Sequence, residues 1–430
     1  MPDVPAADNG LAQPDDGSIT EALGLPPTPF YQPIVSVPEG ATVGYEALAR
    51  WPSLGYPDPQ LVFEVASSEP AILAELDQRC ITGALDTFLQ SGRGAGALLF
   101  VNTHPSCDFP SEAVDARAER LTERRLRLVF ELTERHLLDR PPTLMKKIDA
   151  IRQRGWAIAF DDVGADSAAL PLLDVVAPEV IKLDMRLVQS VPGVSASQVM
   201  PAVLKYREGT EAVIVAEGVE TSSQYNRALA WGATLAQGHR FGPPVPLSTL
   251  PLMLWSDFEV PAHQRVRPPR ARNSPFNVLF AAGAKPQPAA LSTIQSLARH
   301  IRIIATLPEN PSIVLVVLPD DDLVRVNQTA LLRMRKAITA IPFFAIYGHG
   351  LPEGFGAIGI RTVSVAPSDP LAKELLILAL GPHAAAAIAV HGFGRESLTK
   401  DRSELRYVVS YDRELITTIV CDLLATESAA

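Results

Sequence analysis

Six apolar runs within the first 245 residues each end in a polar or charged side chain that could take part in chemistry. In one of them, residues 212–216 are small or strand-forming, and Glu217 and Gly218 follow at once. This pattern is typical of a buried parallel strand that delivers its last side chain to the carboxyl edge of a sheet. The six runs end at Asn102, Glu131, Asp161-Asp162, Lys182, Glu217 and Gln237. Because such edges meet at one rim of a β/α barrel, we expect these side chains to form one polar site.

Five members of this set, together with one further glutamate, are candidate metal ligands. They are Glu46, Asn102, Glu131, Asp161, Asp162 and Glu217. Hard oxygen ligands suit Mg²⁺ or Mn²⁺ and not zinc, since no cysteine stands at a strand end and His104 and His239 fall outside the pattern as surface or packing residues. Carboxylates brought together raise one another's pKa values unless cations neutralise them. Two cations could generate hydroxide from water and stabilise charge that develops on phosphorus.

Each of these residues, taken alone, has an ordinary explanation. A carboxylate at a strand end is often the N-cap of the next helix, and an isolated Lys182 would be a surface lysine. Glu134 and Glu220 each follow a candidate ligand by three residues and are expected to support loops without touching metal. The series as a whole, and no single member, therefore predicts a site.

The segments between the runs carry helical patterns, and this alternation predicts a β/α barrel. Two earlier strands, residues 30–37 and 44–48, are joined by a turn too short for a parallel crossover and must be antiparallel. We therefore expect an α/β fold: a TIM-like (β/α)8 barrel with one antiparallel strand, followed by a second, smaller α/β domain.

A length of 430 residues fits two domains. Residues 1–27, rich in Pro, Asp, Gly and Ala, are predicted to be a disordered tail, and residues 28–260 the barrel. Residues 261–275 hold four arginines among prolines and are predicted to be a linker; a nucleic-acid arm is the alternative. Residues 276–430 form the second domain.

Several elements of the expected fold lie outside the polar-tipped strands. A helix over residues 247–258 is expected to close the barrel. In the second domain we expect strands over residues 277–280, 313–318, 343–347, 384–390 and 406–410. The expected helices there are residues 291–302, 323–340 and 371–380, with a last helix that Asp412 caps and that runs to residue 424.

Composition argues against some classes of binding partner. A net charge of −10 argues against a sequence-independent grip on DNA or RNA. The most apolar stretch, residues 375–390, is interrupted by Pro382 and His383, so no membrane span is expected. Three widely spaced cysteines predict free thiols in a reducing cytoplasm, and the acidic start of the chain lacks the order of a secretory signal.

The order of short motifs in the barrel carries a family resemblance. It starts with Glu46-Ala47-Leu48 and Arg50, whereas a second Glu-Ala-Leu at residues 21–23 lacks both a preceding strand and the arginine. The later motifs contain Asn102, Glu131, Glu134, Asp161, Asp162, Lys182, Glu217, Glu220 and Gln237. Over residues 28 to about 258 the chain resembles the EAL family of cyclic di-GMP phosphodiesterases. Because the motifs match in order over two hundred residues, the resemblance is specific.

The resemblance implies roles for these residues. Asp161 would bridge two metal ions held by the six candidate ligands, and Lys182 and Glu217 would orient or deprotonate the attacking water. Gln32, Leu48, Arg50, Asp184 and Gln237 are the implied substrate-binding residues, with Arg50 at a phosphate. Cyclic di-GMP would be cut to linear pGpG, and a homodimer through the barrel is an open alternative to a monomer.

One loop departs from the family pattern. After Asp161-Asp162, active members usually have an aromatic residue, a second glycine and a tyrosine, which Val163–Ser167 lacks. Because every candidate ligand is retained, we expect activity. The departure motivates an alternative, a receptor that binds cyclic di-GMP without hydrolysing it; a purely structural module is disfavoured by the cost of burying carboxylates without a purpose.

The C-terminal part resembles the DICT sensory domain, and the similarity is strongest over residues 406–415. The resemblance implies that residues 276–430 sense a signal and regulate the barrel. The sequence does not identify that signal.

Overall fold

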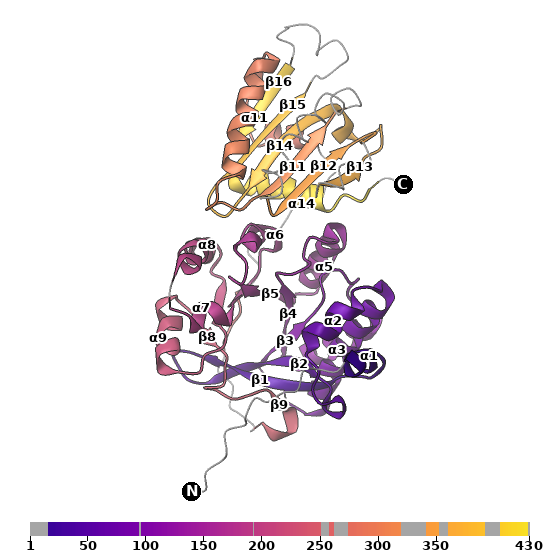
Figure 1. Cartoon of the computed structure of the whole chain (residues 1–430), viewed down its shortest axis with the longest axis vertical. Helices are drawn as coiled ribbons and strands as arrows, with labels where there is room; N and C mark the ends of the chain where they lie inside the picture. The colour runs from indigo at the N-terminus through magenta and orange to yellow at the C-terminus, as the bar shows by residue number, and fades with distance from the viewer. Residues whose placement is uncertain are drawn as a thin grey trace.

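Two sheets organise the chain, one closed and one open (Figure 1). The computed structural model describes residues 16–93, 96–191, 193–250, 258–261, 274–319, 341–351, 360–391 and 405–428. Among these residues, no helix has both the length and the apolar character needed to cross a bilayer.

The first sheet is a barrel with one added strand. β1 (Thr28–Ser36) pairs antiparallel with β2 (Thr42–Arg50), and the strands from β2 to β8 run parallel in chain order. These are β3 (Leu98–Asn102), β4 (Arg127–Thr133), β5 (Ala157–Val163), β6 (Val180–Leu183), β7 (Val213–Ala216) and β8 (Leu235–Ala236). β8 pairs with β1 and closes the ring, while β9 (Val245–Pro246) adds to the outer side of β1. The expected barrel with one antiparallel strand is confirmed.

Strand sequences explain the layers of the barrel. β6 and β7 are buried at every residue, as expected of parallel strands that are covered on both faces. Inward-facing residues such as Ile34, Phe100, Val129 and Val215 fill the interior. The outer faces pack against helices α3 (Pro70–Gln90), α4 (Glu112–Glu123), α5 (Pro141–Gln153), α6 (Leu172–Val176), α7 (Met185–Gln189), α8 (Val194–Thr210) and α9 (Ser222–Ala230). Helix α2 (Pro59–Ala66) packs in a separate cluster with Trp51 and part of α3.

The expected disordered tail is wrong for its last part. Residues Asp16–Gly24 form helix α1. Ile19 and Ala22 lie one helical turn apart and are buried against a cluster that includes Trp51 and Val62. Burial of this small apolar stripe outweighs the high Pro, Gly and Asp content of the segment. Residues 1–15 lie outside the described part of the chain.

The second sheet is mixed, with strand order β10-β16-β15-β14-β11-β12-β13. β11 (Ile313–Leu318), β12 (Phe343–Gly348) and β13 (Arg361–Ser364) are parallel, whereas β10 (Gln287–Ala289), β14 (Glu374–Leu380), β15 (Ala385–His391) and β16 (Leu405–Ser410) pair antiparallel. α11 (Leu291–Ala305) and α14 (Arg413–Leu424) pack on the two faces of the sheet. Asp412 caps α14, as expected.

Two expectations for local structure were wrong, and a third is only partly described. The expected strand over residues 277–280 is wrong: Pro275–Ala281 form helix α10, because Ser274 caps it and Pro275 takes its first position. The expected helix over 371–380 is a 3-10 turn, Pro370–Lys373, followed by β14, whose apolar run fits a central strand equally well. At residues 247–258 the structure describes a 3-10 turn, Leu247–Thr249. The expected helix 323–340 and most of the expected linker lie outside the described residues.

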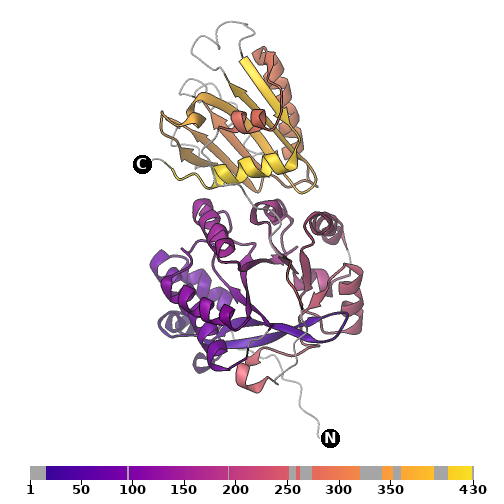
Figure 2. The ribbon, with the colours of Figure 1, turned by 180° about the vertical axis from the view of Figure 1, so that it is seen from behind.

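The two domains share one hydrophobic core. α14 lies along α5 and α6 of the barrel, where both views show it at the boundary (Figures 1 and 2). The guanidinium group of Arg413 bonds the buried carboxylate of Asp174 on α6, with Nε to Oδ2 at 3.0 Å. Arg361 of β13 donates to the carbonyl oxygens of Leu138 and Asp139, at 2.6 and 2.7 Å. The second domain therefore contacts segments that follow β4 and β5.

Candidate active site

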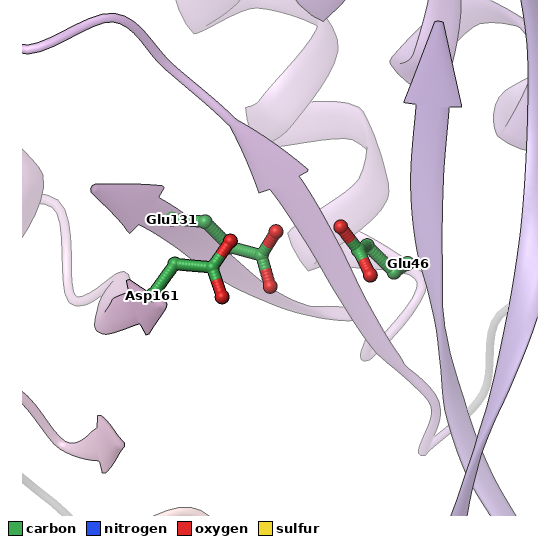
Figure 3. Close-up of side chains that lie close together, drawn as sticks. All are labelled: Glu46, Glu131 and Asp161. Atoms are coloured by element: carbon green, nitrogen blue, oxygen red, sulfur yellow. The ribbon is translucent and has the colours of Figure 1, made fainter. Parts of the chain in front are cut away.

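Carboxylates from three strands of the barrel point toward one another at its carboxyl rim. Glu46 of β2, Glu131 of β4 and Asp161 of β5 are brought together in Figure 3, with carboxylate oxygens within 4.8 Å of one another. A second group, Asp161, Asp162 and Glu217, satisfies the same distance. The two groups share Asp161. The residues of each group could hold one cation, and such cations would activate water and stabilise charge on a phosphate.

Lys182 lies at the centre of these carboxylates. Its Nζ is 2.8 Å from Glu131 Oε1 and from Glu217 Oε1, 3.0 Å from Asp161 Oδ1 and 3.4 Å from Glu46 Oε2. Lys182 is almost fully buried, so its charge is screened little by water. A single ammonium group thus balances part of four negative charges.

Two side-chain amides fix the orientation of Glu46. Asn102 Nδ2 donates to Glu46 Oε1 at 3.1 Å, and Gln237 Nε2 donates to Glu46 Oε2 at 2.7 Å. Gln237 Nε2 also donates to Gln32 Oε1 at 2.8 Å, and Gln32 donates to the carbonyl of Gly242 at 3.1 Å. Predicted residues from β1, β2 and β3, and Gln237 directly after β8, therefore form one hydrogen-bonded group.

The pKa values show how crowded the charges are. Burial, and then the charges of Glu46 and Asp161, raise the pKa of Glu131 well above its usual range, against the lowering effect of Lys182. Burial also raises the pKa of Glu217 well above its usual range, and burial with the charge of Asp161 raises that of Asp162 to about 6. Burial opposes the charged form of Lys182, but the surrounding carboxylates raise its pKa well above the usual value. Such a cluster has affinity for additional positive charge.

The residues present fit a pair of hard cations. Glu131 is fully buried, and its Oε2 accepts no hydrogen bond from any residue that the structure describes. A buried carboxylate oxygen without a donor is costly and calls for a partner such as an ion. Every candidate ligand offers oxygen only, as Mg²⁺ and Mn²⁺ prefer.

A cavity of about 690 Å³ opens onto the carboxylates. Among the predicted residues, Glu46, Leu48, Arg50, Asn102, Asp161, Asp162 and Glu217 line it. The predicted metal-binding, catalytic and substrate-binding residues that are not among its lining residues are Gln32, Glu131, Lys182, Asp184 and Gln237. Asp184 instead caps α7, accepting from the Arg186 N–H at 2.7 Å, and pairs with the Arg186 guanidinium. The arrangement places two arginines, Arg50 and Arg135, and several acidic side chains around a space large enough for a nucleotide.

A family model described as the EAL domain matches residues 27–244, half of the chain. The chain belongs to the EAL domain family. A probable cyclic di-GMP phosphodiesterase of Escherichia coli, PdeG, is 31% identical over 226 residues, which is 50% of this chain and 44% of PdeG. The cyclic di-GMP phosphodiesterase RocR of Pseudomonas aeruginosa is 30% identical over 223 residues, 50% of this chain and 57% of RocR. The match thus spans about half the length of each relative.

A solved structure, the manganese and cyclic di-GMP complex of Klebsiella pneumoniae BlrP1, is 28% identical to the matched region. The match covers 52% of this chain and 56% of BlrP1, with a TM-score of 0.45.

Two glutamates of the EAL domain stand beside loops. Glu134 is half-buried and hydrogen-bonds the backbone of Asp166, within the unusual loop Val163–Ser167; burial raises its pKa to about 8. In that loop Gly164 has a positive φ of 104°, and a side chain there would collide with Leu187, which explains why this glycine is retained. Glu220 is exposed, 3.6 Å from the ring of His239.

Two buried charged side chains beside the site of the EAL domain, Asp77 and Lys147, were not predicted from the sequence. Asp77 of α3 accepts from the His104 N–H at 2.7 Å, and Lys147 of α5 donates to Thr103 Oγ1 and to the His104 carbonyl at 2.7 and 2.6 Å. Both charged groups are almost fully buried and hold the segment that directly follows Asn102. The available signal was Asp77 itself, which falls on the apolar stripe formed by Leu73 and Ile81.

Proposed function

We propose that this protein hydrolyses one phosphodiester of cyclic di-GMP to give linear pGpG, with two Mg²⁺ or Mn²⁺ ions. The observation that carries the proposal is the pair of carboxylate groups that share Asp161, four of whose members, Glu46, Asp161, Asp162 and Glu217, line the cavity. Membership of the EAL family and the names of PdeG and RocR support the choice of substrate.

Bound cations would supply a hydroxide from water at neutral pH and neutralise charge on the phosphate. In the proposed reaction Glu217, which lines the cavity and has a raised pKa, accepts the proton of the attacking water. Lys182, held protonated by its carboxylate neighbours, orients that water. Arg50 lines the same cavity and binds a substrate phosphate. Asn102 and Gln237 keep Glu46 oriented.

The second candidate function is a receptor that binds cyclic di-GMP without turning it over. The unusual loop Val163–Ser167, which Glu134 contacts, favours it. The retained set of oxygen ligands favours hydrolysis.

Incubation of the full chain with cyclic di-GMP and Mg²⁺ or Mn²⁺, followed by chromatography of the products, separates the two functions. The enzyme forms pGpG, and a chelator or the substitution Glu46→Gln stops its formation. Metal-dependent binding of cyclic di-GMP without formation of pGpG would favour the receptor function over the enzyme function. If the chain neither binds nor hydrolyses cyclic di-GMP, both candidate functions are rejected.

We further propose that residues 276–430, which resemble a DICT sensory domain, modulate this reaction. The bonds from Arg361 to the segment after β4, and from Arg413 to α6, support such coupling. A homodimer through the barrel stays a proposal, as does the absence of a nucleic-acid or membrane partner.

A further inference from the structure

Three aromatic rings from separate parts of the barrel lie in a row at the cavity. Phe63 comes from α2, His104 follows β3, and His136 follows β4. The rings of Phe63 and His104 are parallel within 3°, with centroids 6.4 Å apart. Those of His104 and His136 are tilted by 28°, with centroids 5.9 Å apart. All three line the same cavity as the carboxylates of Glu46, Asp161, Asp162 and Glu217.

The spacing leaves ring surface uncovered. Aromatic rings in direct face-to-face contact lie about 3.5–4.0 Å apart, so rings with centroids 5.9 and 6.4 Å apart are displaced or separated. His104 and His136 also line a neighbouring cavity of about 610 Å³, so open space borders them on more than one side. The side chain of His136 is 51% exposed. The row therefore offers aromatic surface to a ligand.

The two histidines are held in place by contacts outside the row. The buried pair Asp77 and Lys147 bonds both backbone groups of His104. His136 Nδ1 lies 2.7 Å from Asp139 Oδ2, and the carbonyl of Asp139 accepts a hydrogen bond from Arg361 of the second domain. Rings that are fixed before a ligand arrives lose little side-chain entropy when it binds.

We propose that Phe63, His104 and His136 form a subsite for a purine base, in the cavity that the candidate metal-binding carboxylates and Arg50 also line. The π-face of a base stacks on aromatic side chains, and the contribution per base is substantial and tolerant of base identity. The subsite rests on the proposed function, because the proposed substrate, cyclic di-GMP, carries two purine bases. It adds the residues that would receive one of those bases. These residues lie outside the motif series that defines the site at the strand ends.

The test compares two small probes that differ only in the base. The full chain with Mg²⁺ is titrated with GMP and with ribose 5-phosphate by calorimetry. The wild type binds GMP about tenfold more tightly or better, in keeping with one stacked base. His136→Ala brings this ratio close to one, whereas His136→Phe retains it because phenyl also has a π-face. His300→Ala, an exposed histidine of α11, serves as the matched control and keeps the wild-type ratio.

Equal affinity of the wild type for both probes, or an unchanged ratio in His136→Ala, overturns the subsite. Hydrolysis of cyclic di-GMP is measured in the same samples. A His136-dependent preference for GMP without hydrolysis retains the base subsite and removes the proposed reaction. Hydrolysis without such a preference removes the subsite alone.

Discussion

The two domains bury carboxylates in opposite ways. In the second domain Glu374 is buried beside Ser274 and accepts the N–H of Phe276 at 3.1 Å, so its negative end has donors. In the barrel Glu131 is buried more completely, faces Glu46 and Asp161, and keeps one oxygen without a donor. A carboxylate surrounded by donors stabilises a fold, whereas carboxylates that surround one lysine form a site with affinity for more cations.

The largest expected effect is at the centre of the barrel cluster. Lys182→Met removes the ammonium group that contacts four carboxylates, and hydrolysis of cyclic di-GMP falls by about 10²–10⁴-fold. In a chelator the variant is also less stable by about 3–5 kcal/mol, because buried charges lose their partner. Denaturant unfolding and a product assay measure both changes. The exposed Lys285→Met is the control, and equal behaviour of the two variants would contradict the account.

Substitution of Glu131 in the barrel and of Glu374 in the second domain distinguishes a carboxylate of the site from a carboxylate that only stabilises the fold. Glu131→Gln lowers hydrolysis about 10²-fold or more and abolishes stabilisation by Mg²⁺. Stability in a chelator changes little, because burial and the neighbouring carboxylates raise the pKa of Glu131 and oppose its charged form. Glu374→Leu leaves hydrolysis unchanged and costs about 1–3 kcal/mol, because the Phe276 N–H loses its acceptor. Thermal unfolding with and without Mg²⁺ and a turnover assay provide the readouts. If Glu374→Leu lost activity and Glu131→Gln did not, the contrast between the two domains would be contradicted.

A smaller effect is expected where the two domains meet. Arg361→Ala removes two hydrogen bonds to the carbonyls after β4 and raises the KM for cyclic di-GMP several-fold, with a smaller change in kcat. Arg361→Lys restores part of the loss. The exposed Arg299→Ala, on α11, is the matched control. Steady-state kinetics of the three variants check the coupling, and identical kinetics for Arg361→Ala and wild type would show that the domains are uncoupled.

The last expected effect is a dependence of stability on pH at Glu134. Burial raises its folded pKa to about 8, above the value in the unfolded chain, so the folded state holds a proton that the unfolded state has released. The contribution of this group to stability therefore falls as pH rises from about 4 to about 8. Glu134→Gln has no proton to release and flattens this part of the profile. Chemical denaturation at several pH values tests the slope, and an unchanged slope would contradict the raised pKa.

The rim of the barrel was predictable because strand ends are local features. An apolar run that stops at Glu131 or Glu217 identifies both a strand and the position of its last side chain. The four contacts of Lys182 were not predictable, because they depend on how strands far apart in the chain are staggered around the barrel. Asp77 and Lys147 were missed for the same reason, although the position of Asp77 on an apolar stripe was a usable signal.

The second domain was harder to predict because its signals conflict. The apolar run 374–380 fits a buried helix or a buried strand, and only its place between β11 and β15 decides for a strand. At residues 275–281 the deciding signal was local, since Ser274 and Pro275 mark a helix start. The resemblance of the second domain to a DICT domain stays a prediction.

The most direct test of the account is the number of Mn²⁺ ions bound by the full chain. Equilibrium titration followed by electron paramagnetic resonance counts the ions and detects magnetic coupling between neighbours. The account predicts two coupled ions in the wild type, and loss of that coupling in Asp161→Asn, because the two carboxylate groups share Asp161. No bound ion, or two uncoupled ions that Asp161→Asn leaves unchanged, would contradict it.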